Sequence, residues 1–474
     1  MTRTDRARFD PRLTAALTAS KLTAFGIRRL GRGGGTSAPG LVAERIDPHL
    51  LTKITSRLDA GSIVVAGTNG KTTTSRMIAD ILTAAGYDVV HNRSGSNLVR
   101  GVASAFAAHA SILGHPRGQI GVIEADEAAF PAIVKLSKPR YILLNNLFRD
   151  QLDRYGELDT IARHWKTAFQ SLDESTTIIV NGDDPTLVAI TDDIRARRVT
   201  FGLDEINHRL DALPHAADAA TCRVCGADLA YRALYLSHLG EWYCPNCGRE
   251  RPKLDVTGSD IVLHGVDSLT LSATPRDEAP VPLEIGVPGL YNAYNTLAAY
   301  AVTREAGVAP VAIQGALAKF RSAFGRIERL DYRNRKLTMA LVKNPVGFNE
   351  VLRMLTSGSD GLAVPTLIAI NDRDADGRDV SWLWDVDFEL LADGEGLLGT
   401  TGIRGSDMAN RLKYAGVPLD RIKMLDNDLA TGLDSFVDRL PEGSSGYILP
   451  TYTAMLELRK TLADRGAVES FWQQ

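Results

Sequence analysis

The 474-residue sequence predicts an α/β protein with a doubly wound, mostly parallel sheet in its central domain and a further α/β domain at its C-terminal end. Three observations predict this fold class. Short apolar segments alternate with segments of helical periodicity, a pattern that favours parallel strands joined by helices. The first such segment, 62–66, leads directly into a glycine-rich loop and a helix. All four cysteines lie between residues 222 and 247, which indicates a small insertion.

Composition limits the class of protein before any motif is considered. The chain has 54 Lys and Arg against 57 Asp and Glu, a net charge of -3, which supplies no general attraction to nucleic acid or anionic lipid. Hydrophobic residues make up 44% and charged residues 23%, as in a folded globular protein. No apolar run is long enough to span a membrane, and the N-terminus lacks an apolar signal core. We therefore expect a cytoplasmic protein with reduced thiols.

The N-terminal segment, 1–45, is predicted to be a helix followed by a flexible linker around Gly33–Gly35. Arg28 and Arg29 lie beside apolar residues and could touch an anionic membrane surface, but so few charges attract lipid only weakly. We expect this helix to pack on the sheet domain instead.

The glycine-rich loop, residues 67–74, reads Gly-Thr-Asn-Gly-Lys-Thr-Thr-Thr between a strand and a helix. Backbone N–H groups at such a turn surround a phosphate, Lys71 reaches the β and γ oxygens, and Thr72 offers its hydroxyl to Mg²⁺. The general pattern would need a glycine at position 65, where the sequence has Val65. The strand–loop–helix context nevertheless predicts a site for nucleotide phosphates.

Polar residues follow the other predicted strands at the same edge of the sheet. Glu124 directly follows the strand 120–123 and is our first candidate for holding the metal. Asp126 and Glu127 instead fit a helix N-cap. The strands 141–144 and 177–180 lead into Asn- and Asp-rich turns. His91, after the strand 88–90, is a candidate contact for an anionic substrate, with an ordinary crossover loop as the alternative.

The cysteines form two CxxC pairs separated by eighteen residues, the spacing of one tetrahedral zinc site. The predicted ligands are Cys222, Cys225, Cys244 and Cys247. Four sulfur ligands leave no open position for water, so the metal would be structural, and no thiol would remain as a nucleophile. We expect His238, between the pairs, at the surface. A zinc ribbon that binds nucleic acid is the alternative, but the segment has only a modest basic tail.

Four motifs together resemble the Mur ligase family. They are the loop at 67–73, Asn-Gly-Asp-Asp-Pro at 181–185, the stretch from Gly289 to Ala299, and Gly-Arg-Ile-Glu at 325–328. The resemblance implies a ligase that uses ATP and Mg²⁺ to phosphorylate a carboxylate, after which an amine displaces phosphate. It also implies the residues at the nucleotide and its metal: Gly67, Thr68, Asn69, Gly70, Lys71, Thr72, Thr73, Glu124, Asn292, Asn295 and Arg326.

Three features depart from the ordinary amino-acid-adding members of that family. The histidine they use for a second metal is absent from the stretch 150–153, Lys166 is the only nearby candidate for their carbamylated lysine, and the cysteine-rich insertion is foreign to them. The amine donor is therefore expected to differ.

The C-terminal third, through the segments 343–349, 371–385, 401–416 and 450–455, resembles the MurT family, the Mur-ligase-like subunits of lipid II isoglutaminyl synthase. This resemblance implies ATP-dependent amidation of the α-carboxylate of D-isoglutamate in the lipid II stem peptide, at the inner face of the cell membrane. It implies ammonia from a separate GatD-like class-I glutamine amidotransferase subunit. It also marks Asp379 as the residue that completes the partner's Cys–His pair.

Other residues of the C-terminal third have two interpretations each. Lys343, Asn344 and Asn349 are candidates for the acyl-phosphate site, with loop chemistry before Pro345 as the alternative. Trp382 and Trp384 fit either an interface or a core.

We divide the chain into 1–45, a central ATP-binding domain 46–331 with a zinc-ribbon insertion at 205–255, and a C-terminal domain 332–474. Two rival functions are retained: a stand-alone Mur or folylpolyglutamate-type ligase that adds an amino acid, and a nucleic-acid-binding NTPase.

Overall fold

The computed structural model describes residues 9–29, 37–92, 96–149, 157–214, 217–265, 267–321, 327–356 and 363–468. Its larger sheet has nine strands in the order β11-β10-β9-β6-β5-β4-β1-β3-β2. Their bounds are β1 (Ser62–Ala66), β2 (Val89–His91), β3 (Ile120–Glu124), β4 (Tyr141–Leu144), β5 (Thr177–Asn181), β6 (Arg197–Leu203), β9 (Val256–His264), β10 (Ser268–Pro275) and β11 (Val281–Ile285). Along this order, every pair of neighbouring strands from β9 to β2 is parallel. The strands β10 and β11 add an antiparallel edge next to β9. The predicted mostly parallel sheet is confirmed.

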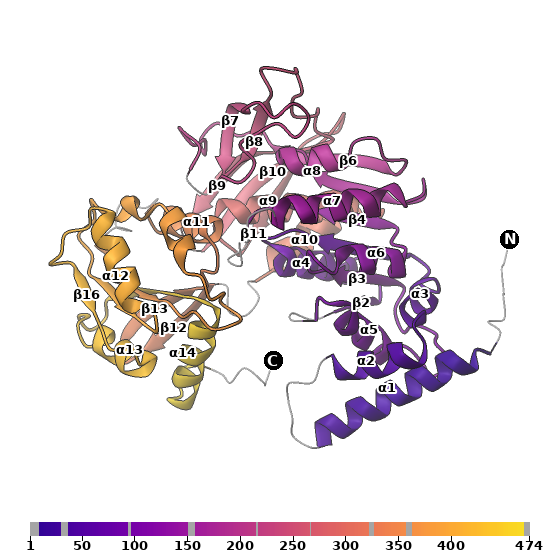
Figure 1. Cartoon of the computed structure of the whole chain (residues 1–474), viewed down its shortest axis with the longest axis horizontal. Coiled ribbons are helices and arrows are strands. Elements are labelled where there is room, and N and C mark those ends of the chain that lie inside the picture. Colours follow the sequence, from indigo (N-terminus) through magenta and orange to yellow (C-terminus); the bar gives the residue numbers. More distant parts are fainter. Residues whose placement is uncertain are drawn as a thin grey trace.

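Helices cover both faces of this sheet (Figure 1). One face carries α4 (Lys71–Ala84), α9 (Leu290–Glu305) and α10 (Pro310–Lys319). The other carries α1 (Pro11–Arg29), α2 (Ala38–Ile46), α3 (Leu50–Thr55), α5 (Val99–Ala108), α6 (Phe130–Ser137), α7 (Glu157–Gln170) and α8 (Pro185–Ile190). Alternate side chains of a strand point to opposite faces, so the buried interior strand β1 supplies Ile63 and Val65 to the first core and Val64 and Ala66 to the second.

The N-terminal helix is docked on the sheet domain, as expected. Leu13, Ala16 and Leu17 of α1 are fully buried in the second core, and the adjacent face of the helix packs on α2 and α5.

A two-stranded antiparallel hairpin leaves the larger sheet between β6 and β9. Its strands are β7 (Ala230–Leu236) and β8 (Leu239–Tyr243), and a CxxC pair lies outside each of them in sequence.

The C-terminal part of the chain forms a second, six-stranded sheet in the order β12-β13-β17-β14-β15-β16. Its strands are β12 (Ile327–Tyr332), β13 (Arg335–Ala340), β14 (Thr366–Ala369), β15 (Leu398–Thr401), β16 (Ile422–Met424) and β17 (Ser445–Pro450). On one face lie α11 (Pro345–Thr356), α12 (Gly405–Tyr414) and the 3₁₀ turns η2 (Ser381–Asp385) and η3 (Phe388–Leu391), and on the other α13 (Leu429–Val437) and α14 (Tyr452–Asp464).

This second sheet confirms the predicted C-terminal α/β domain. Because β12 begins at Ile327 and belongs to the second sheet, we propose that the domain boundary precedes Ile327 instead of following residue 331.

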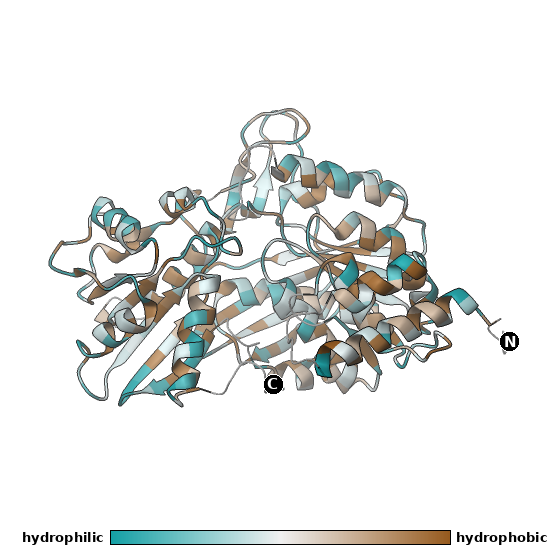
Figure 2. Cartoon of the chain, turned by 60° about the horizontal axis from the view of Figure 1, so that its bottom comes forward, coloured by the Kyte–Doolittle hydropathy of each residue, from teal (hydrophilic) through white to brown (hydrophobic). Residues whose placement is uncertain are grey.

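Hydrophilic residues gather on the peripheral helices and loops (Figure 2). Among the described residues, no helix combines the length and apolar character that a membrane crossing requires.

Candidate functional site

The glycine-rich loop lies at the carboxyl end of β1, an interior strand of the larger sheet between β4 and β3. Gly67 and Gly70 both have positive φ angles, 149° and 83°. A Cβ atom on Gly70 would lie 2.0 Å from Oδ1 of Asn295, so a larger residue at this position would have to displace the Asn295 side chain. The loop backbone is held by the segment after β4, because Thr68 N–H donates to the carbonyl of Asn146 and Asn69 N–H donates to its side-chain Oδ1.

Lys71, the first residue of α4, points its ammonium group into this loop. Its Nζ donates to the carbonyl oxygen of Thr68 at 3.2 Å and to Oε1 of Glu127 at 2.8 Å. Burial raises the pKa of Glu127, and the attraction of Lys71 opposes that rise. Glu127, which the sequence suggested as a helix cap, is therefore the counterion of Lys71, the lysine predicted to bind phosphate.

Thr72 and Glu124 lie together, as the sequence predicts for a metal site. The Thr72 hydroxyl donates to Oε1 of Glu124 at 3.1 Å. Asn92 fixes the end of β3, because its Oδ1 accepts from the Glu124 N–H and its Nδ2 donates to the Glu124 carbonyl. A hydroxyl and a carboxylate oxygen suit a hard cation such as Mg²⁺. This role of Asn92 at the end of β3 was not predicted from the sequence.

Four buried polar side chains connect the loop helix α4 to α9. Asn145 Nδ2 donates to the Thr74 hydroxyl at 2.9 Å and to Oδ1 of Asn295 at 3.1 Å. Asn295 Nδ2 in turn donates to Oδ1 of Asn292. The two α9 asparagines therefore lie beside the loop, where the resemblance expected them, and Asn145 joins them there. The sequence feature that could have identified Asn145 is its position directly after the apolar strand 141–144.

The C-terminal domain contributes residues to the same place. Asn344 Nδ2 donates to Oδ1 of Asn69 at 2.9 Å, and the positive charge of Lys343 opposes the rise that burial causes in the pKa of Glu127. Both residues line a cavity between the two domains together with Gly70 and Asn295. Asn349 is not brought to the loop, because its amide and carbonyl pair with Asp387.

Asp379 lies away from this cavity's lining, in the loop between β14 and η2 of the C-terminal domain. Its carboxylate is exposed, and Oδ1 accepts from the N–H of Ser381 at 2.8 Å. The hydrogen bonds from Ser381 lower the pKa of Asp379. Asp376 holds the loop, since its Oδ1 accepts from the N–H of Thr453 at 2.7 Å.

The remaining candidates are placed as follows. His91 is the last residue of β2 and lies opposite Val122 of β3. Lys166 lies exposed on α7. Trp382 is buried in the C-terminal core, as one of the two interpretations expected, whereas Trp384 is 51% exposed and its place in an interface stays a prediction. Arg326 and the stretch 150–153 lie outside the described residues.

The four cysteines come together at the base of the β7–β8 hairpin. Their sulfur atoms all lie within 4.8 Å of one another, and the closest pairs, Cys225–Cys244 and Cys222–Cys247, are 3.4 and 3.7 Å apart. Four thiolates about 2.3 Å from a tetrahedral zinc would be separated by about 3.8 Å. The cluster therefore fits the predicted closed zinc site, and all four cysteines are thiols in this structure.

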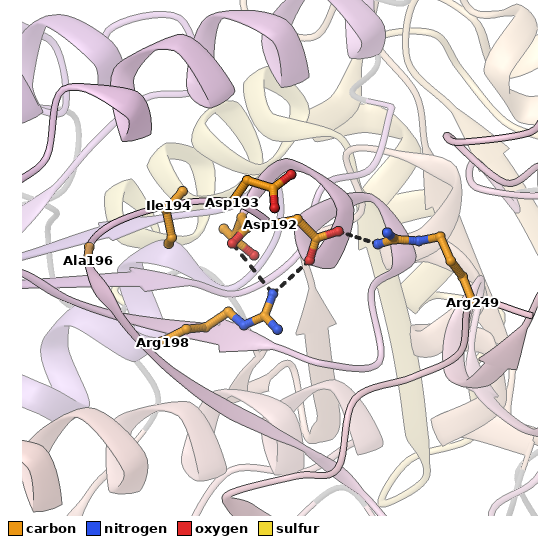
Figure 3. Close-up of a pocket in the computed structure, with 7 residues that line it drawn as sticks. Asp192, Asp193, Ile194, Ala196, Arg198 and Arg249 are labelled. Carbon is orange, nitrogen blue, oxygen red and sulfur yellow. Dashed lines mark hydrogen bonds and ion pairs between the residues drawn. The ribbon is translucent and has the colours of Figure 1, made fainter.

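We call residues 222–249, the β7–β8 hairpin with its two CxxC pairs, the cysteine module. Two arginines that share one aspartate join it to the larger sheet. Figure 3 shows Asp192, just after α8, between Arg249 of the module and Arg198 of β6. The Arg198–Asp192 distance is 3.0 Å. These residues line a shallow pocket that shares no residue with the cavity beside the phosphate loop.

His238 does not lie at the surface, contrary to the sequence expectation. Its side chain is fully buried at the turn between β7 and β8, and Nε2 lies 3.5 Å from Oδ2 of Asp184. Its ring packs on Phe148, with the centroids 4.8 Å apart. A two-residue turn is usually solvated, but here the segment after β4 covers it.

Comparison with known proteins identifies the two domains separately. The Mur ligase middle domain model matches residues 65–233, and the MurT ligase C-terminal model matches residues 341–455. The chain is 34% identical over 459 residues to the lipid II isoglutaminyl synthase (glutamine-hydrolyzing) subunit MurT of Streptococcus pneumoniae, covering 96% of this chain and 98% of that one. It is 32% identical over 422 residues to the same subunit of Staphylococcus aureus, covering 88% and 91%.

Solved structures share the fold at low sequence identity. A pseudomurein peptide ligase type C from Methanothermus fervidus superposes with a TM-score of 0.65 at 17% identity, over 85% of this chain and 78% of that one. The MurF ligase from Thermotoga maritima, solved in complex with ADP, gives a TM-score of 0.60 at 14% identity, over 88% and 84%.

Proposed function

Because the chain belongs to the MurT family, whose members have the Mur ligase fold, we propose that it is the synthetase subunit of a lipid II isoglutaminyl synthase. In this proposal it uses ATP to convert the α-carboxylate of the D-isoglutamate residue in the lipid II stem peptide into an amide. The observation that carries the proposal is the 34% identity to a named MurT subunit over 96% of the chain. Both the phosphate loop and the C-terminal domain lie within that match.

The first step is phosphorylation of the substrate carboxylate. A carboxylate oxygen attacks the γ-phosphorus of ATP, the bond from that phosphorus to the β–γ bridging oxygen breaks, and ADP leaves. Lys71 and the loop N–H groups hold the β and γ oxygens, and Lys343 brings a second positive charge toward the transferring group. Asn344, hydrogen-bonded to Asn69, keeps the second domain against the loop during transfer.

The proposal also assigns residues to the metal. Thr72 and Glu124 would hold Mg²⁺, since their oxygens lie 3.1 Å apart beside the loop. When bound, Mg²⁺ neutralises phosphate charge and orients the γ-phosphate for in-line attack.

The second step forms the amide bond. Ammonia attacks the acyl carbon through its lone pair, the carbon–oxygen bond to phosphate breaks, inorganic phosphate leaves, and the nitrogen loses one proton. Ammonia is small and needs no side-chain pocket, which agrees with the departures of this sequence from the amino-acid-adding ligases.

The ammonia source is a second subunit. All four cysteines of the chain lie in the one cluster, so a zinc-loaded chain retains no thiol to attack glutamine. We propose a GatD-like class-I glutamine amidotransferase as the partner. The exposed carboxylate of Asp379 would orient the partner's histidine and stabilise its protonated form. Acting on lipid II, the complex would work at the inner face of the cell membrane.

The test is mass spectrometry of lipid II after incubation with ATP and Mg²⁺. The chain alone with ammonium chloride is compared with the chain plus its partner and glutamine. The expected product carries an amino group in place of a hydroxyl at the second stem residue, located by fragmentation, and the glutamine reaction needs the partner. Addition of a whole amino acid instead would refute this function and support a stand-alone ligase.

A further inference from the structure

The β7–β8 hairpin of the cysteine module reaches from the metal cluster to the cavity between the two domains. Cys244 directly follows β8, and the turn of residues 222–226 that carries the first CxxC pair lies just before β7. At about 3.4 Å per residue, the five residues of β8, which pair with the whole length of an irregular β7, place the tip of the hairpin about 14 Å from its base. At the tip, Leu236 and Leu239 line the cavity beside Gly70 and Asn295. A metal at the base cannot touch a ligand in that cavity, but it fixes both strands that lead there.

The tip of the hairpin also contacts residues 147–148, which hold the phosphate loop. His238 packs on Phe148 and lies 3.5 Å from Asp184. Asp184 accepts the N–H of Leu147 at 2.8 Å, and the Phe148 N–H donates to the Thr68 hydroxyl at 3.0 Å. A displacement of the tip would therefore be passed to Thr68 of the loop in two steps, from His238 to Phe148 and from Phe148 to Thr68.

The same tip contacts the C-terminal domain. Nη1 of Arg353, on α11, donates to the carbonyl oxygen of Tyr235 at 3.0 Å and to Oε1 of Glu350 at 2.8 Å. Tyr235 itself is fully buried. The hairpin thus touches the phosphate-loop segment on one side and α11 on the other.

The wall that the hairpin gives the cavity is apolar. Leu236 and Leu239 face a lining that includes Tyr291, Tyr294 and Val346. Apolar and aromatic walls near phosphate-binding groups suit the planar base of a nucleotide.

We propose that the hairpin of the cysteine module forms one wall of the nucleotide pocket and that metal bound at its base holds this wall in place. Metal occupancy then sets the affinity for nucleotide and the docking of α11. His238 is a positioning residue in this arrangement, because it acts on the loop through Phe148 and Asp184. The proposal rests on the proposed function in one respect, since it takes the cavity as a site for ATP.

The experiment measures binding of ADP with Mg²⁺ to the full zinc-loaded chain by titration calorimetry. The variant Leu239→Ala removes part of the wall and leaves the four cysteines intact. We expect its dissociation constant to rise about tenfold, as for a lost buried apolar contact, with one zinc per chain retained. The matched control is Arg232→Ala, on the same hairpin, whose partners are Glu241 and Glu250 at the hairpin surface.

Metal removal gives a second readout. Chelation is expected to weaken ADP binding by about tenfold and to speed amide hydrogen exchange at residues 68–70, and added zinc should reverse both effects. A folded, metal-free chain with unchanged ADP affinity would overturn the proposal.

The outcomes separate this proposal from the proposed function. If the unsubstituted zinc-loaded chain binds no nucleotide, the proposed function fails and this proposal with it. If it binds ADP and folded Leu239→Ala binds equally well, only the hairpin proposal fails. If Leu239→Ala does not fold, Arg353→Ala decides: affinity lowered at least about threefold supports the proposal, and unchanged affinity refutes it.

Discussion

At the residue scale, the central feature of the site is the pair that Lys71 makes with Glu127. The ammonium and carboxylate lie 2.8 Å apart with side chains that are 10% and 13% exposed. Nucleotide phosphates would compete with this carboxylate for the same ammonium group. Burial raises the pKa of Glu127 above its ordinary value, so the competing charge is present at high pH and is removed by protonation as the pH falls through the raised pKa.

The variant Glu127→Gln should therefore tighten nucleotide binding. It removes the competing charge at every pH, and we expect ADP affinity to rise about three- to tenfold at pH 8. The gain over the unsubstituted chain should shrink as the pH is lowered, because protonation of Glu127 produces the same effect there. Calorimetric titration with ADP across pH checks this. The control is Glu44→Gln on α2, another carboxyl whose pKa burial raises. Weaker binding by Glu127→Gln would show that the carboxylate assists the nucleotide instead.

Lys71 itself should be indispensable for phosphoryl transfer. Lys71→Met keeps the length and apolar stem of the side chain and removes its charge. We expect the rate of ATP-dependent amidation to fall about 100- to 1000-fold, as for other lost groups that stabilise transition-state charge. The exposed Lys166 offers a matched control, Lys166→Met, which should retain full activity. Amidation by Lys71→Met at the normal rate would remove this loop from the mechanism.

At the element scale, helix α4 is preceded by Gly70, where the Asn295 side chain of α9 leaves no room for a Cβ. Gly70 has a φ of 83°, and Gly86, just after the same helix, has a φ of 91°. An added Cβ at Gly70 would strike the Asn295 side chain, whereas one at Gly86 would meet no atom within 4 Å. The two positions thus share backbone strain and differ in their surroundings.

Gly70→Ala and Gly86→Ala form a matched pair. Each should lower the unfolding free energy by about 1 kcal/mol through the left-handed backbone conformation. Only Gly70→Ala should also displace Asn295 and weaken ADP binding, by about tenfold or more. Thermal unfolding and ADP titration of both variants check this. Equal ADP affinity in the two variants would contradict the role assigned to the Gly70–Asn295 contact.

The same scale shows what the sequence could predict. The strands β1, β3, β4 and β5 lie where apolar runs placed them, and the cysteine spacing predicted the cluster, because both signals are local. Glu127 and His238 were misjudged because their partners, Lys71 and Phe148, are distant in sequence. Polar residues near a helix start or a hairpin turn carry no local sign that another segment will cover them. The antiparallel edge of β10 and β11 was not predicted either.

At the scale of the whole molecule, the two sets of candidate residues lie in different places. Lys343 and Asn344 meet the phosphate loop at the interdomain cavity, whereas Asp379 lies in an exposed loop of the C-terminal domain that does not line it. This separation agrees with a division of labour in which ammonia is made at an interface with a second subunit and used at the nucleotide site. The two reactions should then be separable by mutation.

The variant Asp379→Asn tests that separation. It keeps the size of the side chain and an oxygen that can accept from the Ser381 N–H, but it removes the carboxylate charge, which the hydrogen bonds from Ser381 otherwise maintain by lowering the pKa. A partner histidine would lose the group that orients and stabilises it, so glutamine-dependent amidation should fall by about 1000-fold or more. Amidation with ammonium chloride should stay within about twofold, since Asp379 does not line the nucleotide cavity. Asp374→Asn, an exposed carboxylate of the same loop paired with Arg378, should leave both reactions unchanged. Equal loss of both reactions would place Asp379 in the synthetase site, and equal retention would exclude it from glutamine hydrolysis.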